Sequence, residues 1–463
     1  MKKLLSLLIV FAITATVFAG CSLFGEYFIN GVALEEYTIV YSAAALDYTE
    51  RAAGYLHDEI RRLTGVNLTV ITDDSEPCAH EIVVGESNRP ISAALDVLTG
   101  GFEFSIMADD NHVAIEGASF VIAAAAYYFV DTYIGRSSFD ATIAKEATVH
   151  TPITKPAENY VLLIGDGMGF NQTRLFDVFS AEELGMYSDG ESAFYGYMFP
   201  YQGGARTDSL SGTTDSAAAA TALATGFKTI NSYVGVDGDA NIVTTLVELA
   251  KELGMATAVM STESLMGATP ASFTAHTTSR SDADAIKIWQ DQKKSQGTVI
   301  RGEYGAEYDE STIKNRVEAD LRQVLSELSR DRDGFFLMYE EAYFDKHSHA
   351  NELQNTFFAG LRFNQIIGTV MEFAFYNPET FVLITADHET GGLTQSDDGG
   401  YYYTTGSHTS ADVPVFAYGA SAWVFDDRLI ENIQIPKTFA AMWGIELRGY
   451  MDEKYPSLLP LRQ

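Results

Sequence analysis

Short apolar segments alternate with helical stretches from about residue 155 to the end of the chain, and this alternation restricts the fold more than any other feature. The predicted strands are Tyr160–Ile164, Ala256–Met260, Phe335–Met338, Phe381–Thr385 and Val413–Tyr418. Strands that alternate with helices are typical of a mostly parallel sheet flanked by helices, so we predict an α/β fold. In such sheets, side chains that do chemistry gather just past the carboxyl ends of the strands.

Carboxylates stand directly after two of these strands. Glycines on both sides of Asp166 allow a tight turn after the first strand and leave its carboxylate at the strand tip. Glu340 follows the third strand closely, and Asp345 and His349 come next. Because Asp345 and His349 lie four residues apart, they would face the same way on a helical turn and can hold one metal ion.

Histidines accompany the last two predicted strands. Asp387 and His388 follow the strand that ends at Thr385, and an adjacent Asp-His pair at a strand end is a good pair of metal ligands. His408 stands just before the final strand. Taken alone it would be interpreted as a core or surface histidine, but beside the other clusters it becomes a candidate ligand.

A polar loop that begins at Thr207 leads into an alanine-rich helix that ends near Gly226. The helix is predicted to begin at Asp215 and Ser216, where a side chain usually caps the first backbone N–H groups. This helix end carries positive partial charge, which suits an anion or a phosphate. Taken alone, a capped buried helix is the simpler interpretation. The planar guanidinium of Arg280 can bind a phosphate through two hydrogen bonds, although a single arginine is normally a surface residue.

In this order, the segments around these residues resemble those of alkaline phosphatases over nearly all of residues 158–420. The matching pieces are Gly165-Asp166-Gly167-Met168-Gly169, Asp215-Ser216-Ala217-Ala218 with Thr221-Ala222 and Thr225-Gly226, Ala268-Thr269-Pro270-Ala271 leading to Ser279-Arg280, Glu340 with Asp345 and His349, Asp387-His388-Glu389-Thr390-Gly391-Gly392, and His408-Thr409. Six ordered motifs are a strong signal.

The resemblance implies a hydrolase that releases inorganic phosphate from small phosphate monoesters through a phosphoserine on Ser216, with Arg280 gripping the phosphate. It also implies two Zn²⁺ ions and one Mg²⁺. The implied ligands are Asp345, His349 and His408 for the first zinc, Asp387, His388 and Asp166 for the second, and Asp166, Thr269 and Glu340 for magnesium. Two metal ions roughly 4 Å apart stabilise both the attacking and the leaving oxygen of an in-line displacement. Monoester hydrolysis at alkaline pH is therefore expected.

Two residues depart from the family pattern. Gly267 stands two residues before Thr269, where many members have Asp or His near the third metal. Lys346 follows Asp345, where other members often have His, and a lysine there reaches the phosphate through water in some relatives. Lys346 is thus a candidate substrate-binding residue. The identity and occupancy of the third metal site stay open, because outer-shell groups tune such sites.

Other activities of the same superfamily remain as alternatives. A sulfatase needs Pro and Arg shortly after its nucleophile, and Ser216 is followed by four alanines. A phosphodiesterase or a cofactor-independent phosphoglycerate mutase shares metal-binding Asp and His sets, although the Thr-Pro-Ala segment at Thr269 favours a phosphatase. A surface-anchored binding protein with an inactive phosphatase domain is the alternative from another class. Retention of the nucleophile and zinc ligands argues against it.

The chain is predicted to have three parts: a lipoprotein signal peptide over residues 1–20, a small α/β accessory domain over 21–150, and the phosphatase domain over 151–463. Pro152 and Pro156 mark the boundary between the last two. The accessory domain resembles the non-catalytic N-terminal domain of α-glucuronidases and related glycoside hydrolases. Contact with carbohydrate or cell wall is the functional interpretation of this domain, and a packing or spacer role is the simpler one. Whether the protein forms a homodimer is left open.

The N-terminus predicts export. Lys2 and Lys3 precede an apolar run that is too short for a comfortable membrane span. Phe18-Ala19-Gly20-Cys21 resembles the lipobox of bacterial lipoproteins, so Cys21 is predicted to carry a lipid that anchors the protein at the cell surface or in the periplasm. The formal net charge of −33, with no basic run, excludes nucleic acid as a partner. An anionic substrate would therefore need local cations.

Overall fold

The computed structural model describes residues 26–95, 100–177, 194–306 and 316–460. The predicted signal peptide and Cys21 lie outside these residues. No described helix is both long enough and apolar enough to cross a membrane.

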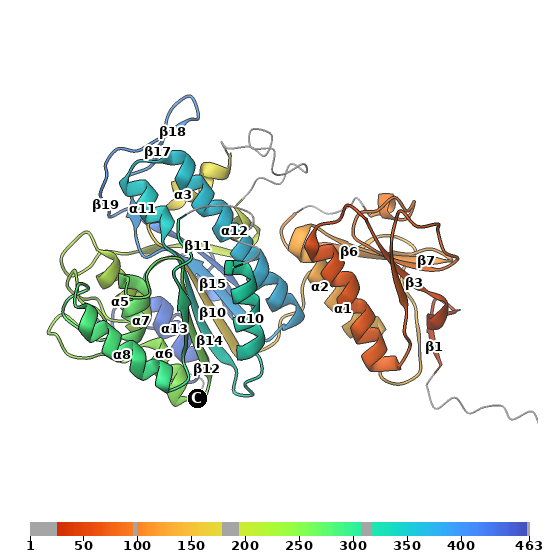
Figure 1. The fold of residues 1–463 in the computed structure, drawn as a ribbon, viewed down its shortest axis with the longest axis horizontal. Helices are drawn as coiled ribbons and strands as arrows, with labels where there is room; N and C mark the ends of the chain where they lie inside the picture. The colour runs from red at the N-terminus through yellow and green to blue at the C-terminus, as the bar shows by residue number, and fades with distance from the viewer. Residues whose placement is uncertain (1–25, 96–99, 178–193, 307–315, 461–463) are drawn as a thin grey trace, which may run out of the picture.

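The larger of two main sheets contains eight strands within the described residues, in the order β13-β12-β14-β10-β15-β20-β11-β21 (Figure 1). In chain order these strands are β10 (Asn159–Gly165), β11 (Tyr201–Arg206), β12 (Ala256–Ser261), β13 (Val299–Gly302), β14 (Phe335–Glu341), β15 (Thr380–Thr385), β20 (Val413–Tyr418) and β21 (Leu429–Glu431). Among them β20 alone runs antiparallel to its neighbours. The predicted mostly parallel α/β fold is confirmed.

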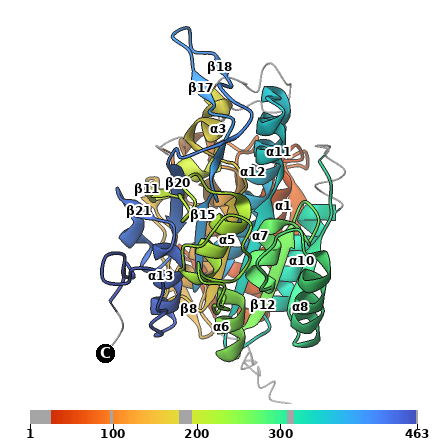
Figure 2. The same ribbon diagram turned by 90° about the vertical axis from the view of Figure 1, so that its left-hand side faces the viewer.

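Helices cover both faces of this sheet. They are α3 (Phe170–Arg174), α5 (Ser216–Thr225), α6 (Leu246–Glu252), α7 (Ala268–Thr274), α8 (Ala283–Ser295), α10 (Glu318–Leu328), α11 (Tyr343–His349), α12 (Leu353–Tyr376) and α13 (Gln434–Met442). Figure 2 shows α5, α6 and α7 on the face turned away from the N-terminal part of the chain. Helices α10 and α12 cover the opposite face (Figure 1).

Short elements complete this part of the chain. Two small hairpins join β16 (Glu389–Thr390) to β19 (His408–Thr409) and β17 (Thr394–Gln395) to β18 (Tyr401–Tyr402). The 3₁₀ helices are η4 (Leu175–Asp177), η5 (Tyr195–Met198) and η7 (Ala422–Phe425).

The second main sheet lies in the N-terminal part and has the order β4-β3-β5-β7-β6-β9. Its strands are β3 (Thr38–Tyr41), β4 (Thr69–Thr72), β5 (Glu81–Val84), β6 (Phe104–Ala108), β7 (His112–Gly117) and β9 (Thr148–His150). A smaller sheet joins β1 (Tyr27–Ile29), β2 (Val32–Ala33) and β8 (Phe139–Ala141). The helices are α1 (Asp47–Thr64) and α2 (Ile122–Tyr133), with the 3₁₀ turns η1 (Leu34–Glu36), η2 (Ser92–Ala94) and η3 (Ser119–Val121).

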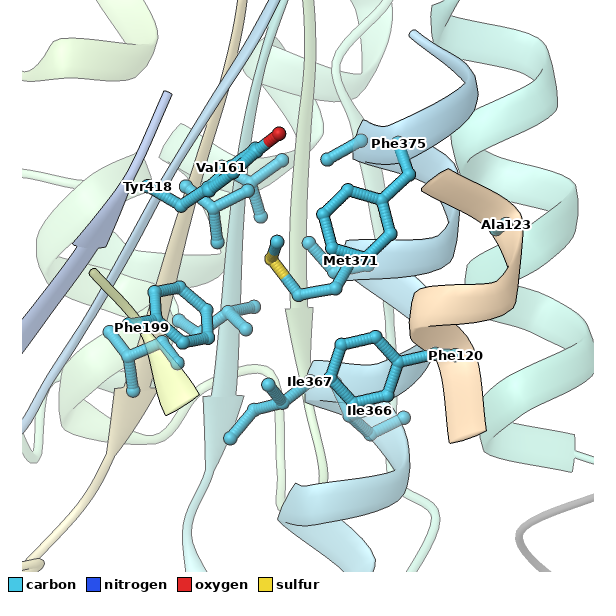
Figure 3. Close-up of a cluster of buried hydrophobic side chains, with 14 of the residues drawn as sticks. Phe120, Ala123, Val161, Phe199, Ile366, Ile367, Met371, Phe375 and Tyr418 are labelled. Atoms are coloured by element: carbon cyan, nitrogen blue, oxygen red, sulfur yellow. The ribbon is translucent and has the colours of Figure 1, made fainter. Parts of the chain in front are cut away.

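One apolar core joins the N-terminal part to the larger sheet. Figure 3 shows Phe120 beside Ile366 and Ile367 of α12, with Phe375 of the same helix nearby. The ring of Phe102 lies 5.3 Å from that of Phe375 in an edge-to-face arrangement. Such aromatic pairs add stabilisation beyond the area they bury. Helix α12 therefore packs against the larger sheet and against the N-terminal part. The N-terminal part thus shares a hydrophobic core with the rest of the described chain.

Helix α12 is also tied to the larger sheet by a buried ion pair. The Nε atom of Arg362 donates to Glu341 at 2.6 Å, and its Nη1 atom donates to the carbonyl of Gly305 at 2.8 Å. Both charged side chains are fully buried. A buried carboxylate that loses its cationic partner is strongly destabilising.

We therefore expect Arg362→Met to lower the free energy of unfolding by about 3–5 kcal/mol, because Glu341 would be left buried and unpaired. Urea denaturation followed by circular dichroism measures this change. Arg330→Met, at an exposed arginine, is the matched control. A loss below about 1 kcal/mol for Arg362→Met would show that the pair does not hold the helix.

Candidate active site

The predicted site residues come together at the carboxyl ends of the parallel strands. Asp166 follows β10, Glu340 lies at the end of β14, and Asp387 follows β15. The turn after β10 depends on Gly167, whose φ is +77°. A Cβ atom there would lie 2.7 Å from the Cα atom of Asp345, so only glycine lets this turn approach α11.

Three side chains form the first cation-binding group. His349 Nε2 lies 3.2 Å from Asp345 Oδ1, His408 Nε2 lies 3.4 Å from the same oxygen, and the two Nε2 atoms lie 3.1 Å apart. Ligand atoms around a tetrahedral Zn²⁺, with bonds of about 2.0–2.1 Å, are separated by roughly 3.4 Å. The donors of this group therefore have the spacing that zinc requires.

Backbone carbonyls orient both histidines of this group. His349 Nδ1 lies 2.8 Å from the carbonyl oxygen of Gly406, and His408 Nδ1 lies 2.9 Å from that of Thr214. A carbonyl accepts only from a protonated nitrogen, so the proton is placed on Nδ1 and the lone pair on Nε2. Both imidazoles thus present their metal-binding nitrogen to Asp345.

A second group surrounds His388. Its Nε2 atom lies 3.2 Å from Asp387 Oδ2 and 3.6 Å from Asp166 Oδ1. Both carboxylate oxygens are buried without a hydrogen-bond partner. Burial lowers the pKa of His388 well below its ordinary value, and the neighbouring His408 lowers it further. The imidazole is therefore neutral and offers a lone pair.

Asp345 connects the two groups. Its carboxylate, His388 and Asp166 each have a ligand atom within 4.8 Å of the others, and Asp345 also belongs to the first group. The Thr390 hydroxyl donates to Asp345 Oδ1 at 2.6 Å and so fixes the carboxylate. Two cation positions in this part of the structure are therefore adjacent.

Ser216 lies beside the second group. Its Oγ atom is 3.2 Å from His388 Nε2, and the residue is only 3% exposed. It is the first residue of α5, whose N-cap is Asp215, with Asp215 Oδ1 accepting from the N–H of Ala218 at 3.0 Å. The helix start was predicted at these two residues, and Asp215 alone supplies the cap. The hydroxyl of Ser216 is left free to face the cation-binding side chains.

Arg280 is held by the same aspartate. Its Nη1 atom lies 3.2 Å from Asp215 Oδ2, which also accepts from the N–H of Ser232 at 3.0 Å. The Arg280 side chain is 36% exposed, so the guanidinium keeps donors for a solvent-borne anion. Asp215, the N-cap of the helix that begins at Ser216, thus also positions the guanidinium of Arg280.

A third group of oxygens lies on the other side of Asp166. It contains Asp166, Glu340 and Glu263, whose ligand atoms lie within 4.8 Å of one another. The sequence predicted Thr269 here and missed Glu263. Thr269 Oγ1 and Glu340 Oε1 are buried with no hydrogen bond of normal geometry, although the hydroxyl is near enough to the carboxylate to lower its pKa. A carboxylate two residues past the end of β12 was the available signal for Glu263.

The buried carboxylates repel one another when no cation is bound. Burial raises the pKa of Asp166 well above its ordinary value, and the charges of Asp387 and Asp345 raise it further. Burial and Asp345 raise the pKa of Asp387 to about 7. Burial and the charge of Glu263 raise the pKa of Glu340 to about 8. Divalent cations would remove this repulsion, and the mixed oxygen and nitrogen donors are suited to them.

Comparison with known proteins gives a consistent result. A family model described as alkaline phosphatase matches residues 157–304 and 304–404. Alkaline phosphatase 3 of Bacillus subtilis is 26% identical over 347 residues, which are 64% of this chain and 72% of that protein. The alkaline phosphatase of Escherichia coli is 43% identical over 128 residues, 27% of each chain.

A solved structure shares the fold. It is a mutant of the alkaline phosphatase from the Antarctic bacterium TAB5 with Mg bound. It superimposes with a TM-score of 0.52 at 26% identity, and the match covers 63% of this chain and 98% of that one.

Proposed function

The chain belongs to the alkaline phosphatase family and is a phosphoric monoester hydrolase, and on that premise we propose that its activity depends on zinc and proceeds through a phosphoserine at Ser216. The observation that carries the proposal is the position of the Ser216 hydroxyl, 3.2 Å from the nitrogen on which the second cation-binding group converges. A serine so placed is buried beside the cations that would lower its pKa.

The residues that would hold the cations follow from the three groups. Asp345, His349 and His408 would bind the first zinc, Asp166, Asp387 and His388 the second, and Asp166, Thr269 and Glu340 one Mg²⁺. When bound, such cations supply positive charge that favours the serine alkoxide and stabilises the charge of the displaced ester oxygen.

The chain's own groups bind and orient the phosphate. Ser216 begins α5, and Arg280 is paired with Asp215, the N-cap of that helix, so the guanidinium and the free N–H groups of the first turn would bind non-bridging phosphate oxygens. The Ser216 hydroxyl gives up its proton as its oxygen attacks phosphorus, the bond from phosphorus to the ester oxygen breaks, and that oxygen takes up a proton and leaves as the alcohol. Water then attacks the phosphoserine, the bond between phosphorus and the serine oxygen breaks, and inorganic phosphate is released.

A comparison of three chromogenic substrates tests this function. We expect a phosphate monoester to be hydrolysed much faster than a phosphate diester or a sulfate ester, because a monoester dianion offers more negative charge to Arg280 and the cations. Elemental analysis of the active protein should show about two zinc ions per chain. Faster hydrolysis of the diester would favour the phosphodiesterase alternative, and faster hydrolysis of the sulfate would favour a sulfatase.

We also propose that the protein is exported and anchored through a lipid on Cys21. We expect Cys21→Ala to move the protein from the membrane fraction to the soluble exported fraction, since a lipid chain buried in the bilayer supplies the binding energy. Immunoblots of fractionated cells measure this distribution. Cys78→Ala is the matched control, because Cys78 is a free cysteine in the N-terminal part. Continued membrane retention of Cys21→Ala would contradict the anchor.

A further inference from the structure

Glu263 fills the space in front of Gly267. A Cβ atom placed on Gly267 would lie 2.3 Å from Glu263 Oε1 and 2.8 Å from its Cδ atom. The φ of Gly267 is −56°, a value that any residue adopts, so its backbone does not require glycine. The carbonyl oxygen of Ser264 would lie 2.9 Å from the same Cβ atom, so the Glu263 carboxylate and this carbonyl together leave room only for glycine.

The backbone fixes Glu263 in this position. The N–H of Glu263 donates to Ser261 Oγ at 3.1 Å, and its carbonyl accepts from the N–H of Glu303 at 3.0 Å. Ser261 Oγ in turn donates to Glu340 Oε2 at 2.5 Å. The segment that carries Glu263 is therefore joined to the segment that carries Glu340.

The Glu263 carboxylate contacts two kinds of partner. One oxygen, Oε2, accepts from Lys346 Nζ. The carboxylate also has an oxygen within 4.8 Å of ligand oxygens of Asp166 and Glu340. Its side chain is 16% exposed, whereas Asp166 and Glu340 are almost completely buried. Glu263 thus lies at the outer edge of the third group, between its buried oxygens and Lys346.

Buried oxygens without partners indicate that this group binds a cation. Asp166 Oδ1, Thr269 Oγ1 and Glu340 Oε1 are buried and lack hydrogen bonds of normal geometry, and Asp166 and Glu340 both belong to this group. Unsatisfied buried oxygens are costly, and three carboxylates this close repel one another. A hard divalent cation such as Mg²⁺ prefers an all-oxygen set of this kind.

We propose that Glu263 is a ligand of the third divalent cation, that it replaces the side chain that Gly267 lacks, and that the same carboxylate positions Lys346. This inference rests on the proposed function, because the third site adjoins the Ser216 site through Asp166. The side chain that position 267 lacks is thus supplied by Glu263, four residues earlier in the turn between β12 and α7. Glu263 then holds the ammonium group of Lys346 at the outer edge of the third group.

Magnesium titration of the zinc-loaded protein, followed by calorimetry, tests the ligand role without turnover. We expect Glu263→Gln to raise the Kd for Mg²⁺ at least about tenfold, while zinc content stays unchanged and the melting temperature before Mg²⁺ addition does not fall. Glu303→Gln, at an exposed neighbouring carboxylate, should leave the Kd unchanged. Lys346→Met should not weaken Mg²⁺ binding, because it removes a positive charge. An unchanged Kd in Glu263→Gln would overturn the inference.

Moving the carboxylate back to position 267 gives a second, independent test. Gly267→Asp alone should lower the melting temperature, because its side chain meets Glu263. The double variant Glu263→Ala with Gly267→Asp should recover Mg²⁺ binding, and its melting temperature should exceed that of Gly267→Asp alone, because the contact with Glu263 is gone while the one with the Ser264 carbonyl remains. Failure to recover binding with normal zinc content would also overturn the inference. Monoester hydrolysis by wild-type protein with zinc alone is measured in parallel, so that loss of the proposed function is seen separately.

Discussion

Replacement of Ser216 by alanine is expected to lower kcat for a phosphate monoester by at least about 10³-fold, because the variant has no oxygen to form the phosphoenzyme. The substitution removes one buried oxygen next to His388 and leaves the capping hydrogen bonds of Asp215 in place. The helix start and the cation-binding side chains should therefore persist. Zinc content and the melting temperature of the variant should match those of the wild type.

Trapping the intermediate measures the same step directly. Wild-type protein mixed with a monoester and quenched in acid should gain one phosphoryl group, which peptide mass spectrometry locates at Ser216. The variant should gain none. Ser281→Ala, an exposed serine next to Arg280, is the matched control and should keep full activity and labelling. Full monoesterase activity in the Ser216 variant would show that another group, or water itself, attacks phosphorus.

The central strands of the larger sheet, β10, β12, β14, β15 and β20, could be predicted because they are largely buried and so form continuous apolar runs, whereas the more exposed β11, β13 and β21 could not. The segment predicted at Tyr160–Ile164 is β10, and the one predicted at Val413–Tyr418 has the bounds of β20. Parallel strands place their carboxyl ends at one edge, so polar residues after separate strands could be expected to meet there. The convergence of Asp166, Asp387 and His388 follows from this topology.

The position of Glu263 two residues after β12 was a signal of the same kind, but its place in front of Gly267 could not be predicted. Gly267 was interpreted as the loss of an oxygen, because sequence spacing does not tell whether a side chain elsewhere fills the space. The position of Glu263 depends on the turn after β12 and on its pairing with Lys346, which is 83 residues away in the chain. The same limit applies to the N-terminal part: nothing in the sequence around Phe102 indicates that its ring meets Phe375.

The net negative charge of the protein opposes the binding of an anionic substrate at its site. A chain with a net charge of −33 repels an anionic substrate over long distances, and the buried carboxylates of the site add to that repulsion when no cation is bound. Arg280 and Lys346 are each paired with a carboxylate, Asp215 and Glu263, so they position positive charge without adding net charge. Cations bound by the three groups would therefore make the site attractive to phosphate.

Removal of divalent cations by a chelator is expected to abolish monoester hydrolysis and to lower the melting temperature. If cations supply about 4 kcal/mol of transition-state stabilisation, activity should fall by roughly 10³-fold. Cations that bind only the folded protein, at free concentrations a thousand times their Kd, add about 4 kcal/mol to its stability. Differential scanning calorimetry of loaded and stripped protein measures the second effect, and readdition of Zn²⁺ and Mg²⁺ should restore both.

The stability difference between loaded and stripped protein should grow with pH. In the stripped protein the pKa of Asp387 is raised to about 7 and that of Glu340 to about 8. Folded protein then holds protons that the unfolded chain has lost, so its stability falls as pH rises from about 4 to about 8. Bound cations replace those protons and oppose the fall. Asp387→Asn removes one of the repelling carboxylates, so the stripped variant should lose less stability over this range. Equal melting temperatures for loaded and stripped wild type at pH 8 would contradict this account, because the carboxylates would then be tolerated without cations.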